Sequence, residues 1–104
     1  MARSITLAKA DEIPAGKHDV FEVEGTWIAV FNVDDTYYAI EDVCTHDGYP
    51  LEDGEVIGCE IICSRHGARF DLRNGKALTM PAVTATKSYP VRVEGDDLVL
   101  ELED

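Results

Sequence analysis

Basic residues are scarce in this chain: nine lysines and arginines stand against 21 aspartates and glutamates among 104 residues, for a net charge of −12. Nucleic acid and anionic membranes carry charge of the same sign, so we expect neither to be a partner. A basic protein partner fits better, because opposite charges speed association. The charge could also serve solubility alone, and the sequence leaves that alternative open.

Long apolar stretches are missing as well, and cysteines are few. No segment reaches the roughly 20 apolar residues of a transmembrane helix, and the first residues lack the apolar core of a signal peptide. Three cysteines cannot close into a full set of disulfides. We therefore expect a cytoplasmic protein, in whose reducing surroundings a pattern of cysteines and histidines favours a metal site over disulfides.

No stretch shows ten residues of helical periodicity between caps, so the sequence does not predict a helical fold. Short apolar stretches alternate with turn residues instead, as in a series of β-hairpins. Strands are expected at SITLAK, VFEVEG, TWIAVFNV, TYYAIEDV, YPVRVE and LVLELE. Trp27 lies in TWIAVFNV, a nearly continuous apolar run, and is predicted to be a core residue. Val91 and Val93 are predicted to point inward from YPVRVE.

The expected architecture is all-β, with residues 1–104 forming a single domain. A base would be built from residues 1–42 and 81–104. A module of loops and hairpins at about residues 43–80 would be inserted between these two parts of the base.

Two tight hairpins are expected in the inserted module, one around Gly58-Cys59 and one around Asn74-Gly75. The Asn-Gly pair suits the positive φ angles that a type I′ turn requires. Cys59 has no histidine beside it, and we predict a free thiol that binds no metal. His18 lies far from the module and is predicted to be an ordinary surface histidine.

The module carries two pairs of metal-binding residue types, Cys44 with His46 and Cys63 with His66. The spacing is C-x-H, sixteen intervening residues, then C-x-x-H. Each pair follows a strand-like stretch, so two loops could project side by side. Zinc would bind all four side chains in a closed tetrahedral site. A [2Fe-2S] cluster would take both thiolates on one iron and both imidazoles on the other. Common zinc modules place like residues together in each arm, so these mixed arms favour the cluster.

The double motif, followed by HGARFDLRNGKAL, MPA and YPVRVEGDDLVLEL, resembles the Rieske-type ferredoxins that serve ring-hydroxylating dioxygenase systems. The resemblance covers nearly the whole chain. It implies the Rieske fold, with three small antiparallel sheets and one [2Fe-2S] cluster at a tip. Its cluster ligands would be Cys44, His46, Cys63 and His66. Ser64 stands where many relatives have proline, but that position is not a ligand.

The family also implies a function. Such a protein is a one-electron carrier rather than an enzyme, and it would take electrons from a flavin-dependent reductase and pass them to a terminal oxygenase. Partners would dock near His46 and His66, where the electron path is shortest. A proline loop at residues 80–82 would shield the cluster.

The potential of such a cluster depends on its ligands and on the hydrogen-bond donors around it. Two neutral imidazoles raise the potential above that of a cluster with four thiolates. The high-potential Rieske proteins of respiratory complexes add a disulfide and two hydroxyl donors. The matching positions here hold Tyr49, Arg65, Ala68 and Phe70, which supply neither. We therefore predict a potential near the low end of the Rieske range, on the order of −150 mV.

Other functions stay open at this point. The small Rieske-like subunit of a nitrite reductase has a similar sequence pattern but often lacks the ligands. A ferredoxin of another redox pathway would have the same motif. A zinc-stabilised interaction module is the alternative from a different class. The sequence names neither the redox partners nor the substrate of the pathway.

Overall fold

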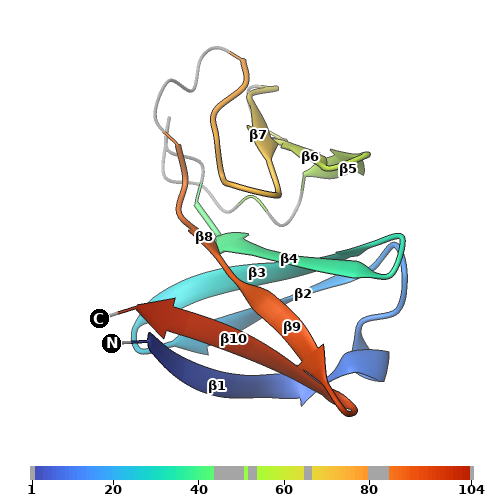
Figure 1. The fold of residues 1–104 in the computed structure, drawn as a ribbon. Coiled ribbons are helices and arrows are strands. Elements are labelled where there is room, and N and C mark those ends of the chain that lie inside the picture. Colours follow the sequence, from blue (N-terminus) through green and yellow to red (C-terminus); the bar gives the residue numbers. More distant parts are fainter. Residues whose placement is uncertain (1, 44–50, 52–53, 65–66, 80–84, 104) are drawn as a thin grey trace.

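The computed structural model describes most of the chain: residues 2–43, 51, 54–64, 67–79 and 85–103. In this part of the chain the strands form three antiparallel sheets (Figure 1), which confirms the predicted all-β fold. The one helical element described is a short 3₁₀ turn, Ala10–Glu12. No described helix is long and apolar enough to cross a bilayer.

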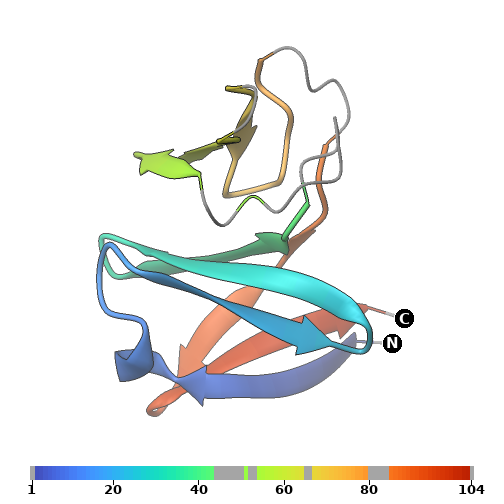
Figure 2. The same ribbon diagram turned by 180° about the vertical axis from the view of Figure 1, so that it is seen from behind.

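Two sheets lie together at one end of the molecule, and we call them the lower sheets (Figures 1 and 2). The first has the order β1-β10-β9 and the second the order β2-β3-β4-β8. The strands of the first are β1 (Ala2–Lys9), β10 (Asp97–Glu103) and β9 (Val91–Glu94). Those of the second are β2 (His18–Val23), β3 (Thr26–Val33), β4 (Thr36–Glu41) and β8 (Ser88–Tyr89).

The third sheet, which we call the upper sheet, lies beyond β4 at the opposite end of the molecule (Figure 1). Its order is β5-β6-β7, and each strand has only three residues. The strands are β5 (Glu55–Ile57), β6 (Glu60–Ile62) and β7 (Arg69–Asp71).

Strand β3 separates two hydrophobic cores, because successive side chains of a strand point to opposite faces. Ile28 and Val30 point into the lower core, between the two lower sheets, while Ala29 and Phe31 point into the upper core, toward the upper sheet. Both faces of β3 are thus covered, as expected for an uninterrupted apolar run. The lower core contains Ile13, Val23, Ile28, Val30, Ala39, Leu98 and Leu100. The upper core contains Ala29, Phe31, Ile40, Leu51, Ile61, Cys63, Ala68, Phe70 and Leu72.

Two residues predicted to be buried are exposed. Trp27 keeps 55% of its surface accessible, because it lies at the start of β3, beyond the part of the strand that the upper sheet covers. Val93 pairs with Leu98 of the lower core, so it points to the inner face of its sheet as predicted, but it stays 47% exposed on β9, an outer strand. The core position predicted for Trp27 was wrong, because a strand pattern gives the spacing of side chains but not the extent of the neighbouring layer.

The turn predictions are partly confirmed. The hairpin at Gly58-Cys59 is a two-residue turn in which Gly58 has φ 61°, and Ile57 pairs with Glu60. The type I′ turn predicted at Asn74-Gly75 was wrong. Only Gly75 has a positive φ there. The reason is that Asp71 closes a four-residue connection: its N–H donates to the Lys76 carbonyl and its carbonyl accepts from the Gly75 N–H at 2.7 Å.

Candidate metal centre

Of the four predicted ligands, Cys63 lies in the described part of the chain. Cys44, His46 and His66 lie outside the described residues, as do residues 80–82. Cys63 directly follows β6 and is 1% exposed, and its thiol is free. The described residues contain no group of three or more metal-binding side chains. The position of the site is therefore described by the residues that flank the predicted ligands.

The segment that leads from Cys63 toward His66 is closed at its foot. The Cys63 N–H donates to the Ala68 carbonyl at 2.7 Å, and the Gly67 N–H donates to the Cys63 carbonyl at 2.9 Å. Gly67 has φ 75°, a conformation that glycine adopts without strain. These contacts close a tight turn between Cys63 and Ala68.

The segment that carries Cys44 and His46 is also closed at its foot. It begins after β4, where Asp42 accepts a hydrogen bond from the Leu51 N–H at 2.8 Å through Oδ1. The Asp42 N–H donates in turn to the Trp27 carbonyl at 2.8 Å, which joins this foot to β3. Asp42 and Leu51 therefore bracket the segment and hold its ends together.

The feet of the two segments meet in the upper core. Leu51 from the first foot and Cys63 and Ala68 from the second belong to the same buried cluster. Gly54 lies so close to the end of β6 that a Cβ there would be 2.0 Å from the Ile62 carbonyl oxygen. Only glycine permits this approach. It places Gly54, which follows the segment with Cys44 and His46, against Ile62, which precedes Cys63.

Thr86 forms a third junction near these feet. It is buried, its N–H donates to the Gly75 carbonyl at 2.8 Å, and its hydroxyl donates to the Glu41 carbonyl at 3.1 Å. A Cβ at Gly75 would be 2.0 Å from the Thr86 carbonyl oxygen. Thr86 thus ties the end of β4 to the connection after β7. Sequence reasoning did not identify Thr86, because an isolated threonine carries no local signal of its partners.

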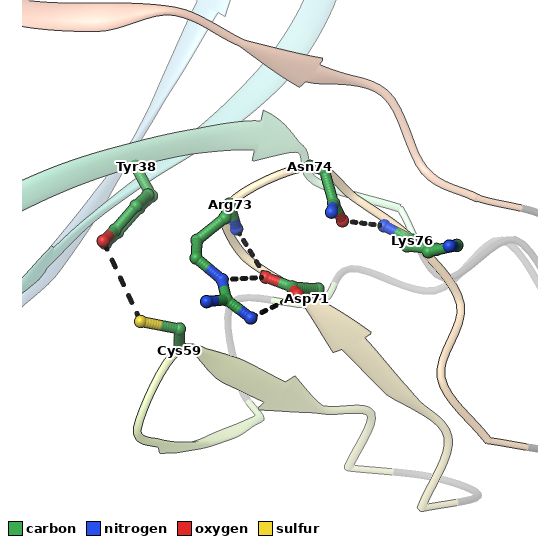
Figure 3. Close-up of polar contacts among 6 residues, drawn as sticks. All are labelled: Tyr38, Cys59, Asp71, Arg73, Asn74 and Lys76. Carbon is green, nitrogen blue, oxygen red and sulfur yellow. Dashed lines mark hydrogen bonds and ion pairs between the residues drawn. The ribbon is translucent and has the colours of Figure 1, made fainter.

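Cys59 directly precedes β6 and Cys63 directly follows it. Cys59 belongs to a polar cluster with Tyr38, Asp71 and Arg73 (Figure 3). Its sulfur lies 3.9 Å from the Tyr38 hydroxyl, and this contact raises the pKa of Tyr38 above its ordinary value. The neighbouring Asp71 carboxylate accepts hydrogen bonds from the Arg73 guanidinium at 2.9 and 3.0 Å, and this pairing lowers the pKa of Asp71. Cys59 is a free thiol, as predicted.

His18 is exposed, which confirms the predicted surface position, and its ring stacks on Phe31 with the ring centroids 5.4 Å apart. It lies on β2 and pairs with Phe31, four residues along β3 from Trp27, whose carbonyl accepts the Asp42 N–H.

The chemistry of the described residues fits an iron–sulfur cluster. A thiol buried at the foot of a closed loop suits a thiolate that binds iron away from water. Ala68 and Phe70, whose positions would carry the hydroxyl-bearing residues in a high-potential site, are both fully buried in the upper core and have no hydrogen-bond donor in their side chains.

Comparison with known proteins points to one family. The model of the Rieske [2Fe-2S] domain matches residues 3–90. The ferredoxin component of the naphthalene 1,2-dioxygenase/salicylate 5-hydroxylase systems of Ralstonia sp. is 38% identical over 99 residues, which are 95% of each chain.

Solved structures agree with this result. The ferredoxin of carbazole 1,9a-dioxygenase from Nocardioides aromaticivorans IC177 is 30% identical, with a TM-score of 0.88 over 93% of this chain and 95% of that chain. A complex of reduced oxygenase and oxidized ferredoxin in carbazole 1,9a-dioxygenase matches with a TM-score of 0.87 and 26% identity, over 93% and 91%. The predicted arrangement of three small antiparallel sheets is thus confirmed.

Proposed function

Because the chain belongs to the Rieske [2Fe-2S] domain family, we propose that it binds one [2Fe-2S] cluster and carries electrons from a flavin-dependent reductase to a terminal oxygenase. The coarser predictions are confirmed: the chain is a Rieske-type ferredoxin similar to components of dioxygenase systems, and so an electron carrier rather than an enzyme. The observation that carries the proposal is the match to a ferredoxin component over 95% of both chains.

The proposed ligands are Cys44, His46, Cys63 and His66, with the two thiolates on one iron and the two imidazoles on the other. When bound, a Rieske cluster takes up and releases one electron within a window of roughly −150 to +300 mV. The burial of Cys63 supports this assignment, since it would exclude water from the thiolate. All four protein ligands would be in use, so no position is left for a substrate on iron.

The closed feet of the two ligand segments would keep the site stiff during electron transfer. Asp42 and Leu51 hold one segment, and Cys63 and Ala68 hold the other. A rigid surrounding changes little when the charge of the site changes, which keeps the cost of reorganisation low. With Ala68 and Phe70 offering no donors, we place the potential on the order of −150 mV.

We also propose the division of the chain into a base, residues 1–42 and 81–104, and a cluster-binding subdomain at about 43–80. The position of the upper sheet supports it, since β5, β6 and β7 all fall between Glu55 and Asp71. A cytoplasmic location is proposed as well, because the free thiol of Cys59 suits a reducing compartment.

The first test is the metal content and the electron paramagnetic resonance of the purified protein. We expect a red-brown protein with two irons and two sulfides per chain, and a signal of the reduced state with an average g below 2. A colourless protein with one zinc per chain would contradict the proposal and favour the zinc-stabilised interaction module.

The second test concerns the ligand set. In a His66→Cys variant a third thiolate would add negative charge to the site, so the potential should fall if a cluster is retained. His18→Ala is the matched control and should leave the potential unchanged, since His18 lies on β2 and is not a proposed ligand. An unchanged potential in a cluster-bearing His66→Cys variant would remove His66 from the ligand set.

A further inference from the structure

Trp27 is the single tryptophan of the chain, and more than half of its surface is exposed. Tryptophan is enriched at the energetic centres of protein interfaces. The residues that follow it in β3, Ile28 to Phe31, are all buried. The exposure is therefore specific to Trp27 and does not reflect a loosely packed strand.

The position of Trp27 links it to the proposed redox site. Its side chain is on the same face of β3 as those of Ala29 and Phe31, which is the face toward the upper sheet. Its carbonyl accepts the N–H of Asp42 at 2.8 Å, and Asp42 closes the foot of the segment that carries Cys44. Two residues span at most about 7 Å, so Cys44 is no farther than that from Asp42.

Two acidic residues, Glu22 and Asp42, lie beside Trp27 in the described part of the chain. Glu22 is directly opposite Trp27 in the pairing of β2 with β3, so its exposed side chain is on the same face. Asp42 follows β4 on the other side of Trp27. Glu41 belongs to the opposite face, since it pairs with Ile28 of the lower core. An exposed indole flanked by carboxylates suits a partner that offers an apolar pocket with basic residues around it.

We propose that Trp27 is the anchor of the surface on which the terminal oxygenase docks, with Glu22 steering the approach. This inference rests on the proposed function. The oxygenase is chosen as the occupant because the surface adjoins the foot of the Cys44 segment, and because a ferredoxin of this fold, 26% identical, is found in complex with an oxygenase. The electron would pass from the reduced ferredoxin to the oxidised oxygenase, with no bond made or broken.

The test measures electron transfer to the oxygenase component of the Ralstonia naphthalene 1,2-dioxygenase system, used as the probe. Reduced ferredoxin is mixed with oxidised oxygenase in a stopped-flow instrument, and the apparent Kd is taken from the dependence of the rate on oxygenase concentration. We expect Trp27→Ala to raise this Kd at least tenfold and Trp27→Phe to raise it less. Glu22→Gln should lower the rate at low salt and have no effect at high salt.

The control is Val93→Ala, which removes another exposed apolar side chain, on β9, and should leave the Kd within twofold of wild type. The potentials of all variants should equal that of wild type, which separates docking from damage to the site. A Kd for Trp27→Ala within twofold of wild type would overturn the proposal. So would a selective loss of reduction by the flavin reductase, since the occupant would then be the reductase.

A second measurement follows Trp27 itself. Wild-type protein labelled with 5-fluorotryptophan has one fluorine, because the chain has one tryptophan. We expect its single ¹⁹F resonance to shift on addition of the unlabelled oxygenase, and its solvent isotope shift to shrink as the indole is covered. An unchanged resonance in a mixture that transfers electrons would overturn the docking proposal alone. A wild-type protein without a reducible cluster would overturn the proposed function instead.

Discussion

The two hydrophobic cores on either side of β3 are built in different ways. The lower core lies between sheets whose main strands have six to eight residues, so regular hydrogen-bonded ladders bring its side chains together. The upper core lies under strands of three residues and takes Leu51, Cys63 and Ala68 from outside any strand. The region proposed to carry the redox site is thus shaped by turns and single hydrogen bonds rather than by long ladders.

This difference matters for how each region loses its structure. A long ladder distributes its stability over many bonds, whereas the upper sheet depends on a few contacts such as those of Thr86 and Gly75. Regions with few buried contacts open locally at lower free energy than the rest of a protein. We therefore expect the upper sheet to respond to substitutions more independently than the lower sheets do.

The largest effect is expected from truncating the upper core. Phe70→Ala removes a fully buried ring and should cost about 3–5 kcal/mol of unfolding free energy. Because Phe70 belongs to the same buried cluster as Cys63, the visible absorption of the cluster should be lost at a lower guanidinium concentration than the β-sheet circular dichroism. Leu100→Ala in the lower core is the matched comparison, and both signals should then fall together. Coincident transitions in both variants would refute the difference between the regions.

A smaller effect is expected at two glycines with positive φ. Gly75→Ala places a Cβ 2.0 Å from the Thr86 carbonyl oxygen, so it combines backbone strain with a broken contact and should cost about 3 kcal/mol. Gly95→Ala in the β9–β10 turn has a similar φ but open space around the Cβ, so strain alone should cost about 1 kcal/mol. Urea unfolding measures both. Equal losses would mean that the approach of Gly75 to Thr86 is not tight.

Removing the hydroxyl of Thr86 should lower the unfolding free energy by a smaller amount. Thr86→Val leaves the Glu41 carbonyl without this donor and should cost about 1–2 kcal/mol. Thr86→Ser keeps the donor and should recover most of the loss. Thr36→Val, at an exposed position of β4, should change the unfolding free energy by no more than about 0.5 kcal/mol. Failure of serine to restore stability would show that the methyl group, not the hydroxyl, is what matters.

The smallest effect on the unfolding free energy is expected from removing an ion pair. The dependence of that free energy on pH identifies the contribution of the pair. Arg73 lowers the pKa of Asp71, so the pair stabilises the fold above the unfolded pKa of about 3.9, and this contribution is lost as the pH falls through the lower folded pKa. Arg73→Gln should therefore lower the unfolding free energy at pH 7, and this loss should shrink as the pH falls through the folded pKa of Asp71. A loss that does not change with pH would show that Arg73 acts through packing instead.

The ion pair of Arg92 with Glu101 in the lower sheets gives the comparison. Arg92 lowers the pKa of Glu101, so the sign of the pH dependence is the same. Asp71 is more buried than Glu101, whose side chain is 25% exposed, so Arg92→Gln should have the smaller effect. Unfolding curves measured at pH 7 and pH 2 for both variants show which ion pair contributes more to the unfolding free energy.

Much of this protein is determined by sequence features that act locally. Alternating apolar residues and turn residues establish the strands, and the spacing of Cys44, His46, Cys63 and His66 indicates the family, because both signals depend on neighbours within a few residues. The same holds for the glycine turns at Gly58 and Gly67, where the backbone conformation itself demands glycine.

Tertiary structure alone decided which ends of these strands are covered. Trp27 reads as a core residue in its strand, yet it is exposed because the upper sheet, built from residues more than 25 positions later, does not reach it. The sequence Asn74-Gly75 predicts a type I′ turn. The backbone adopts another conformation, in which Gly75 forms hydrogen bonds with the backbone of Asp71 and of Thr86. Thr86 gives no local signal at all, since its partners Glu41 and Gly75 are brought to it only when the sheets pack together.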